Sequence, residues 1–124
     1  MVTPEYFRTF GMQITKGRSF TEQDVAGGLP VAIVNETFVK KYLYNVNPLA
    51  QRVVVQQLRL GSLGPPIEWQ IVGVYHDVHN GGVGGEGFPE INVPFAQSPI
   101  PLVRITVRTS GDPASMTNSI ATAV

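Results

Sequence analysis

Short apolar runs, all of strand length, constrain the fold of this 124-residue chain more than any other feature. Val31–Val34 is a continuous apolar run, which is typical of a strand buried on both faces of a sheet. Val53–Val55 and Ile71–Tyr75 are of similar length. None approaches the roughly 20 apolar residues needed to cross a bilayer. We therefore expect a sheet with a buried strand at its centre and no transmembrane segment within this sequence.

Helix and strand signals alternate around these runs, so we expect an α+β fold with a mixed sheet and short helices. Helices are expected from Thr3-Pro4-Glu5 to Gly11 and after the cap Asn35, the second with Phe38, Val39, Tyr42 and Leu43 along one side. Further strands are expected at 12–15, 52–60, 69–78, 90–95 and 102–108, a brief helix after Thr21–Asp24, and a final helix from Asp112. The loop Gly61–Pro66 joins two of these strands in a long hairpin, and Pro94 places the 90–95 strand at an edge.

The last expected helix has a clear start and no stop signal. Asp112-Pro113 provides an N-cap carboxylate and a proline at the first helical position, and an apolar stripe of Met116, Ile120 and Val124 follows. Neither Gly, Asn nor Pro ends this helix before Val124. This pattern predicts a fragment of a longer protein, prone to self-association where the rest of its sheet is missing.

Charge and cysteine content exclude several function classes. The chain has 9 basic and 9 acidic side chains and a formal net charge of zero, so nothing attracts nucleic acid or anionic lipid at long range. There is no cysteine, which rules out disulfides and thiolate metal sites. We therefore expect no nucleic-acid partner.

The most chemically suggestive motifs are incomplete. His76-Asp77-Val78-His79 lacks further nearby ligands, and on a strand its two histidines point to opposite faces. The glycine-rich loop Asn80–Gly87 lacks the Lys-Ser or Lys-Thr of a phosphate loop and leads into a strand rather than a helix. No serine lies in a G-x-S-x-G elbow. We therefore predict no catalytic residue, no cofactor-binding residue and no metal ligand, and we expect the glycine loop to have few fixed contacts.

Aromatic side chains gather near the N-terminus, at Tyr6, Phe7, Phe10 and Phe20. Large aromatics bury most of their area in folded domains, so we interpret this group as a small core. A partner-binding patch is the alternative.

A set of short phrases runs in order along the chain: Thr3-Pro4-Glu5-Tyr6-Phe7, Gly17-Arg18-Ser19-Phe20, Val31-Ala32-Ile33-Val34-Asn35-Glu36, Asn47-Pro48-Leu49, Ile71-Val72-Gly73-Val74, Asp77-Val78, Pro89-Glu90, Pro94-Phe95-Ala96-Gln97, Val107-Arg108-Thr109 and Asp112-Pro113. In order and spacing, these phrases resemble one family from about residue 2 to residue 124, the MacB-like periplasmic core domain of FtsX/MacB-type ABC transporter permeases. Ala50, where the family usually has glycine, and the long 56–66 segment depart from the pattern.

The resemblance implies a non-catalytic extracytoplasmic domain of a membrane permease. Residues 1–100 would be the inserted lobe of a two-lobed domain, and residues 101–124 the strand and helix that return to the membrane-proximal lobe. Expected partners are the rest of the permease with its transmembrane helices, a cytoplasmic ATPase, periplasmic adaptor proteins and a second copy. Efflux, lipoprotein release and envelope signalling all remain open, and a ligand-binding or sensor domain is the alternative function.

Overall fold

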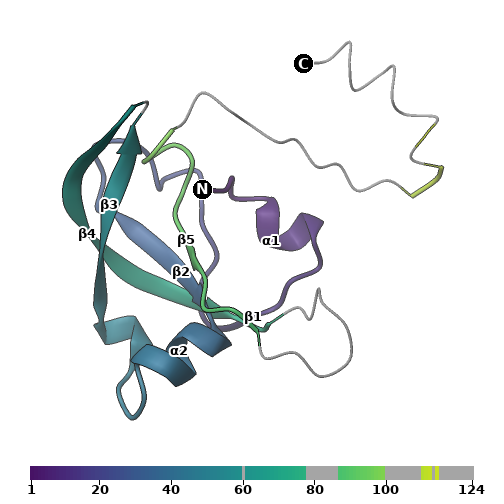
Figure 1. The fold of residues 1–124 in the computed structure, drawn as a ribbon. Helices are drawn as coiled ribbons and strands as arrows, with labels where there is room; N and C mark the ends of the chain where they lie inside the picture. The colour runs from purple at the N-terminus through teal and green to yellow at the C-terminus, as the bar shows by residue number, and fades with distance from the viewer. Residues whose placement is uncertain (60, 78–86, 100–109, 113, 115–124) are drawn as a thin grey trace.

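The computed structural model describes residues 1–59, 61–77, 87–99, 110–112 and 114. Its elements, drawn in Figure 1, are α1 (Tyr6–Thr9), β1 (Ile14–Gly17), β2 (Val31–Asn35), α2 (Glu36–Tyr42), the 3-10 helix η1 (Pro48–Ala50), β3 (Arg52–Arg59), β4 (Ser62–Tyr75) and β5 (Ile91–Asn92). The expected strand at 102–108, most of the final helix and all of the glycine loop except Gly87 lie outside the described residues.

The described residues form a five-stranded mixed sheet, and β4, which pairs with β1, β2 and β3, is its central strand. The strand order is β1-β4-β2-β5, with β2 parallel to β4 and the β1–β4 and β2–β5 pairs antiparallel. Gln70 of β4 pairs with Val31 on one side and with Arg52 of β3 on the other, so β3 and β2 lie on opposite edges of β4. The predicted mixed sheet with short helices is confirmed, as are the buried strand at Val31–Val34 and the edge position of β5.

The sheet carries an apolar cluster on each face. On one face, Phe7 of α1 and Phe20 pack with Ile33 and Tyr75. On the other, Phe38 of α2 packs with Val34, Ile71 and Val74. All five residues of β2 are buried, as its unbroken apolar sequence predicts, because helices or loops cover both faces.

Two glycines allow the strands next to β4 to approach closely. A Cβ on Gly73 would lie 2.2 Å from the carbonyl oxygen of Arg18, and one on Gly17 would lie 2.1 Å from the carbonyl oxygen of Val72. Gly17 also has a φ of +69°, which side-chain-bearing residues rarely adopt. The glycines therefore permit the contact between β4 and the chain that follows β1.

The helix caps follow the sequence signals. The side chain of Asn35 accepts a hydrogen bond from the N–H of Phe38, which caps α2 as predicted. Gly11, with a φ of +65°, follows α1 at the predicted position.

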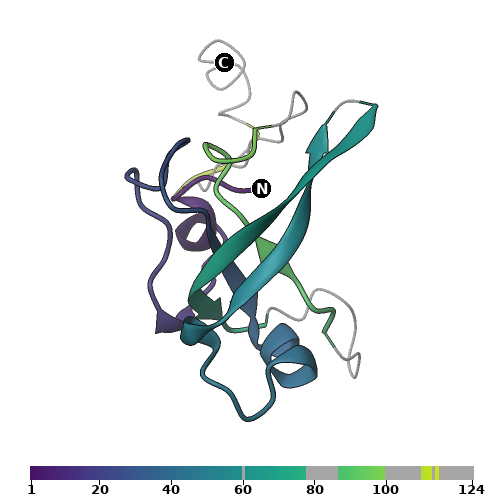
Figure 2. The ribbon, with the colours of Figure 1, turned by 90° about the vertical axis from the view of Figure 1, so that its left-hand side faces the viewer.

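Three sequence expectations are wrong in detail. The strand expected at 12–15 is β1, two residues later. Residues after Thr21 form turns instead of a helix, because the Asp24 side chain accepts hydrogen bonds from the Thr21 N–H and from Arg18. The loop expected at 61–66 belongs largely to β4, so the hairpin is longer than predicted and projects from the body of the domain (Figure 2).

Candidate functional site

A buried polar cluster, which we call the Asn35 junction, joins β2, α2, the end of β4 and the segment that leads into β5. Asn35 is only 3% exposed. Its Nδ2 donates to the carbonyl oxygen of Phe88 at 2.6 Å, and its Oδ1 accepts from the backbone N–H groups of Phe38 at 3.0 Å and Glu90 at 2.9 Å. One side chain thus fixes both the start of α2 and the course of residues 88–90.

Tyr75, at the end of β4, completes this junction. Its hydroxyl donates to the Glu90 carboxylate and accepts from Asn92 Nδ2 at 3.2 Å. Burial raises the pKa of the Tyr75 hydroxyl, and the hydrogen bond to Glu90 raises it further. The neutral phenol therefore serves as a structural hydrogen-bond donor at physiological pH.

A cavity of about 90 Å³ adjoins the junction and is lined by Tyr6, Met12, Asn35, Tyr75, Gly87, Phe88 and Glu90. Pockets for drug-sized ligands have volumes of about 300–1,000 Å³. The cavity has room for only a few waters. The polar side chains of the junction therefore hold neighbouring segments together through hydrogen bonds and do not surround a ligand-sized space.

His76 and Asp77 contact the first turn of α2. His76 Nδ1 lies 2.9 Å from a carboxylate oxygen of Glu36, and the Thr37 hydroxyl donates to Asp77 at 2.6 Å. The second Asp77 oxygen is buried, and no described residue forms a hydrogen bond with it. His79 lies outside the described residues, and among those described no three His, Cys, Asp or Glu side chains gather as metal ligands do.

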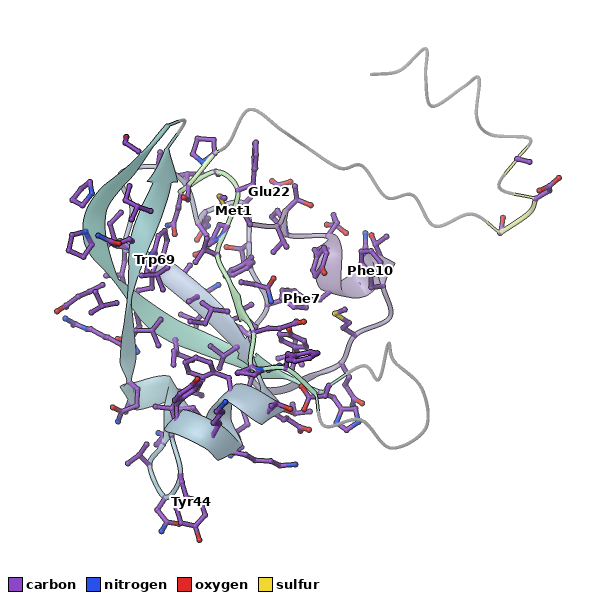
Figure 3. The ribbon with its side chains drawn as sticks, viewed as in Figure 1. Met1, Phe7, Phe10, Glu22, Tyr44 and Trp69 are labelled. Carbon is purple, nitrogen blue, oxygen red and sulfur yellow. The ribbon has the colours of Figure 1, made fainter. Side chains whose placement is uncertain are left out.

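A wider, open groove of about 530 Å³ lies beside α1. Its lining includes Phe7, Met12, Ile14 and Phe20, and the Glu5–Arg8 ion pair lies at the exposed surface of α1. Phe7 and Phe20 are buried, in agreement with the predicted aromatic core. Phe10 is not part of that core: it is 44% exposed and packs only along one side, against Tyr6 (Figure 3).

Three exposed apolar side chains lie at the end of α2 and on the loop that follows it, a segment we call the tyrosine loop: Tyr42, Tyr44 and Val46. Tyr44 is 77% exposed and points away from the body of the domain (Figure 3). The Lys41 ammonium lies 5.6 Å from the centre of the Tyr42 ring, a distance at which a cation is attracted to the ring face. Tyr42 lies on the same side of α2 as Phe38, as its spacing predicts, but Phe38 is buried whereas Tyr42 is 58% exposed and packs against the Phe38 ring.

A second exposed apolar surface lies on the β3–β4 hairpin, where Val54 and Leu63 are each more than 60% exposed. Within the described part of the chain, no helix has the length and apolar character needed to cross a membrane.

The sequence profile of one family, the MacB-like periplasmic core domain, matches residues 1–123. The chain belongs to the MacB-like periplasmic core domain family. This family is defined by a periplasmic domain of transporter permeases and is not a catalytic family. The family resemblance found in the sequence is thereby confirmed.

The MacB-like domain also resembles two characterised proteins. Over 60 residues it is 33% identical to macrolide export ATP-binding/permease protein MacB 2 of Aeromonas hydrophila, a match that covers 48% of this chain and 9% of that protein. The crystal structure of the periplasmic region of MacB from Actinobacillus actinomycetemcomitans superposes with a TM-score of 0.56 at 21% identity, over 98% of this chain and 52% of that one. The second match shows the fold, and the chain spans only part of each relative.

Three of the family-like phrases meet at the Asn35 junction of the MacB-like domain. Val31–Glu36 forms β2 and the cap of α2, Ile71–Val74 lies in β4 next to Tyr75, and Pro89-Glu90 lies opposite Asn35. Sequence reasoning found each phrase but not their meeting point. The asparagine after the apolar run was recognised only as a helix cap.

Proposed function

We propose that this chain is the extracytoplasmic domain of an ABC transporter permease and that it acts without chemistry, by docking to other parts of the transporter and moving with them. The observation that carries the proposal is the family match over residues 1–123. The polar junction and small cavity agree with it, because they suit a rigid domain better than a substrate site.

The proposal includes the surroundings of the domain. The rest of the permease would anchor it in the cytoplasmic membrane, and a cytoplasmic ATPase would move the transmembrane helices to which it is joined. Residues 1–100 would form the inserted lobe, and residues 101–124 would return to the membrane-proximal lobe. Periplasmic adaptor proteins and a second copy of the chain are the further partners.

The tyrosine loop is the docking surface we assign to this function. Tyrosine side chains supply large, amphipathic contact area, and tyrosine is enriched in the cores of protein interfaces. Two lysines, Lys40 and Lys41, precede the loop, and residues 37–51 contain no acidic side chain. The surface is therefore apolar and basic, and suits a protein partner with an acidic rim.

The test uses the permease that carries this domain, with both tyrosines changed (Tyr42→Ser with Tyr44→Ser). Export should fall by at least about tenfold, as expected when interface aromatics are truncated, while ATP turnover by the cytoplasmic domain persists. The matched control is Leu29→Ser, because Leu29 is 66% exposed but lies outside the loop. Wild-type export by the tyrosine variant, or ATP hydrolysis by the isolated domain, would contradict the proposal.

The groove beside α1 favours one alternative, a domain that senses a small apolar ligand. Its volume of about 530 Å³ falls in the range of ligand pockets, and Phe20 lies in its lining. This alternative predicts saturable binding of an apolar fluorescent dye that Ile14→Glu abolishes. Binding that is unchanged in this variant would count against the groove.

A further inference from the structure

No described strand pairs with the outer edge of β3. Among the described residues, β3 pairs with β4 alone, through the register Arg52↔Gln70, Val53↔Trp69 and Val54↔Glu68. The N–H of Ile71 donates to the carbonyl oxygen of Gln51 at 3.1 Å, so Gln51 and the alternate residues Val53 and Val55 direct their backbone groups toward β4. Arg52, Val54 and Gln56 consequently direct theirs outward.

The two edges of this hairpin differ in their protection. The free edge of β4 contains Pro65-Pro66, and Pro66, which pairs with Gln56, belongs to the set of β4 residues whose backbone nitrogen faces away from β3. A proline there removes a donor from the exposed edge, a common protection against unwanted strand pairing. The edge of β3 has no such protection.

The composition of β3 also favours pairing. Residues 53–58 (Val-Val-Val-Gln-Gln-Leu) contain no charge, no proline and no glycine, and their β propensity is high. Val54 is 64% exposed on a hairpin that projects from the domain (Figure 2). An edge strand with an uncharged stretch of this kind between its terminal arginines is a template for another strand.

We propose that this strand is β3 of a second copy of the chain, paired antiparallel about a two-fold axis at Val54. This inference specifies the contact of the homodimer that the proposed function includes, and it rests on that function only for the use of the dimer in transport. The pairing joins the two hairpins into one continuous sheet.

The register follows from symmetry and charge. A two-fold axis at Val54 places Val54 opposite Val54 of the partner subunit, Val53 opposite Val55 of the partner subunit, and Arg52 opposite Gln56 of the partner subunit. No like charges face each other, and opposed valines favour pairing. The paired segment, residues 52–56, also ends before the register shift between Gln56 and Leu58 that interrupts the β3–β4 ladder. About six outward backbone groups on each strand gain hydrogen-bond partners.

A single cysteine at position 54 tests this register, since the chain has no other cysteine. Directly opposed, hydrogen-bonded residues of an antiparallel pair have Cα atoms about 5.5 Å apart, within the range for a disulfide. The full 124-residue Val54→Cys chain should therefore form a covalent dimer under mild oxidation. Glu68→Cys is the matched control: Glu68 is exposed and pairs with Val54, but the two copies of residue 68 would be about 14 Å apart across three strand spacings.

The second measurement is the dimer dissociation constant of the wild type and of Val54→Lys, by analytical ultracentrifugation, with circular dichroism to verify folding. Lysine on the two-fold axis puts like charges side by side, so the constant should rise at least about tenfold. Any of three results would overturn the inference. These are a wild type that stays monomeric at high concentration, equal cross-linking of the two cysteine variants, and a dimer dissociation constant that Val54→Lys leaves unchanged. These outcomes concern the isolated chain, so they do not depend on whether the permease with an altered tyrosine loop exports.

Discussion

The side chain of Asn35 accepts a hydrogen bond at 2.9 Å from the backbone N–H of Glu90, 55 residues further along the chain. This bond connects the buried strand β2 to the segment before β5, which pairs with β2. The same oxygen caps α2, so the helix and the edge strand are held by one buried atom. An amide serves here because it accepts two hydrogen bonds through its oxygen and donates through its nitrogen.

We predict that Asn35→Ala destabilises the domain by about 2–4 kcal/mol, because it removes a helix cap and leaves the carbonyl oxygen of Phe88 and the N–H of Glu90, which lie at a partly buried site, without their partner. Chemical denaturation measures the change. Asn47→Ala is the control: Asn47 also caps a helix, through the N–H of Leu49, but at an exposed site and with one hydrogen bond, so it should cost about 1 kcal/mol or less. Equal losses in both variants would contradict a special role for Asn35.

Gly17 and Gly27 provide a matched pair for the close approach of β1 to β4. Both have positive φ, +69° and +83°, but an added Cβ meets backbone only at Gly17, whereas nothing lies within 4 Å at Gly27. We predict that Gly27→Ala costs about 1 kcal/mol, the ordinary penalty of a left-handed alanine, and that Gly17→Ala costs at least twice as much or prevents folding. Thermal unfolding followed by circular dichroism compares them. Similar midpoints would show that the strands can separate without loss.

The sequence predicted most of the elements near the core because their signals are local. The unbroken apolar run at Val31–Val34 and the cap at Asn35 each specify an element without reference to distant residues. The helix expected after Thr21 does not form, although the Asp24 carboxylate accepts the Thr21 N–H, because the same carboxylate also binds Arg18 six residues earlier and the chain continues in turns. The hairpin was predicted too short because glycine and proline at 61–66 are loop signals, yet Pro66 fits a strand edge.

The functional surfaces were less predictable. The Asn35 junction joins residues from positions 35, 75 and 90, and nothing in a single sequence indicates that these side chains meet. Tyr42 has helical spacing from Phe38 and was predicted on the same side of α2, yet Phe38 is buried while Tyr42, at the last residue of this short helix, is 58% exposed. The helical periodicity therefore identified the apolar side of α2, but it did not indicate which residues on that side are buried and which are exposed.

The buried Tyr75 hydroxyl should make stability fall at alkaline pH. Its pKa is raised by burial and by Glu90, so the folded state keeps the proton above pH 10 while the unfolded state loses it. Stability is thus fully present below the unfolded pKa of about 10 and declines above it, by about 1.4 kcal/mol per pH unit for one such group. Tyr6, whose pKa is also raised, contributes in the same direction.

Tyr75→Phe should therefore flatten part of this alkaline decline, although it lowers stability at neutral pH by about 1–3 kcal/mol because Glu90 loses its donor. Urea denaturation from pH 8 to 11 gives both quantities. Tyr44→Phe, which alters an exposed ring, should reproduce the wild-type slope. An unchanged slope in Tyr75→Phe would mean that this hydroxyl ionises as readily in the folded state as in the unfolded one.

At acid pH, the Arg18–Asp24 pair should dominate instead. Asp24 is 9% exposed and accepts two hydrogen bonds from the Arg18 guanidinium, at 2.9 and 3.1 Å, and one from the Thr21 N–H at 2.8 Å. The hydrogen bonds from Arg18 lower the pKa of the Asp24 carboxyl below its ordinary value of 3.8, and the Thr21 N–H lowers it further. Its contribution is therefore complete above the unfolded pKa and is lost as pH falls from about 4 through the lower folded value.

We accordingly predict that Asp24→Asn costs about 1–3 kcal/mol at pH 7, the range for a charge-assisted hydrogen bond, and that the difference from wild type shrinks below pH 4. Denaturation profiles between pH 2 and 7 measure this. Glu5→Gln is the control, because the Glu5–Arg8 pair is solvent-exposed on both sides and such pairs contribute little. If the cost of Asp24→Asn is independent of pH, the contribution of Asp24 comes from its packing and not from its charge, since only the charge is titrated in this range.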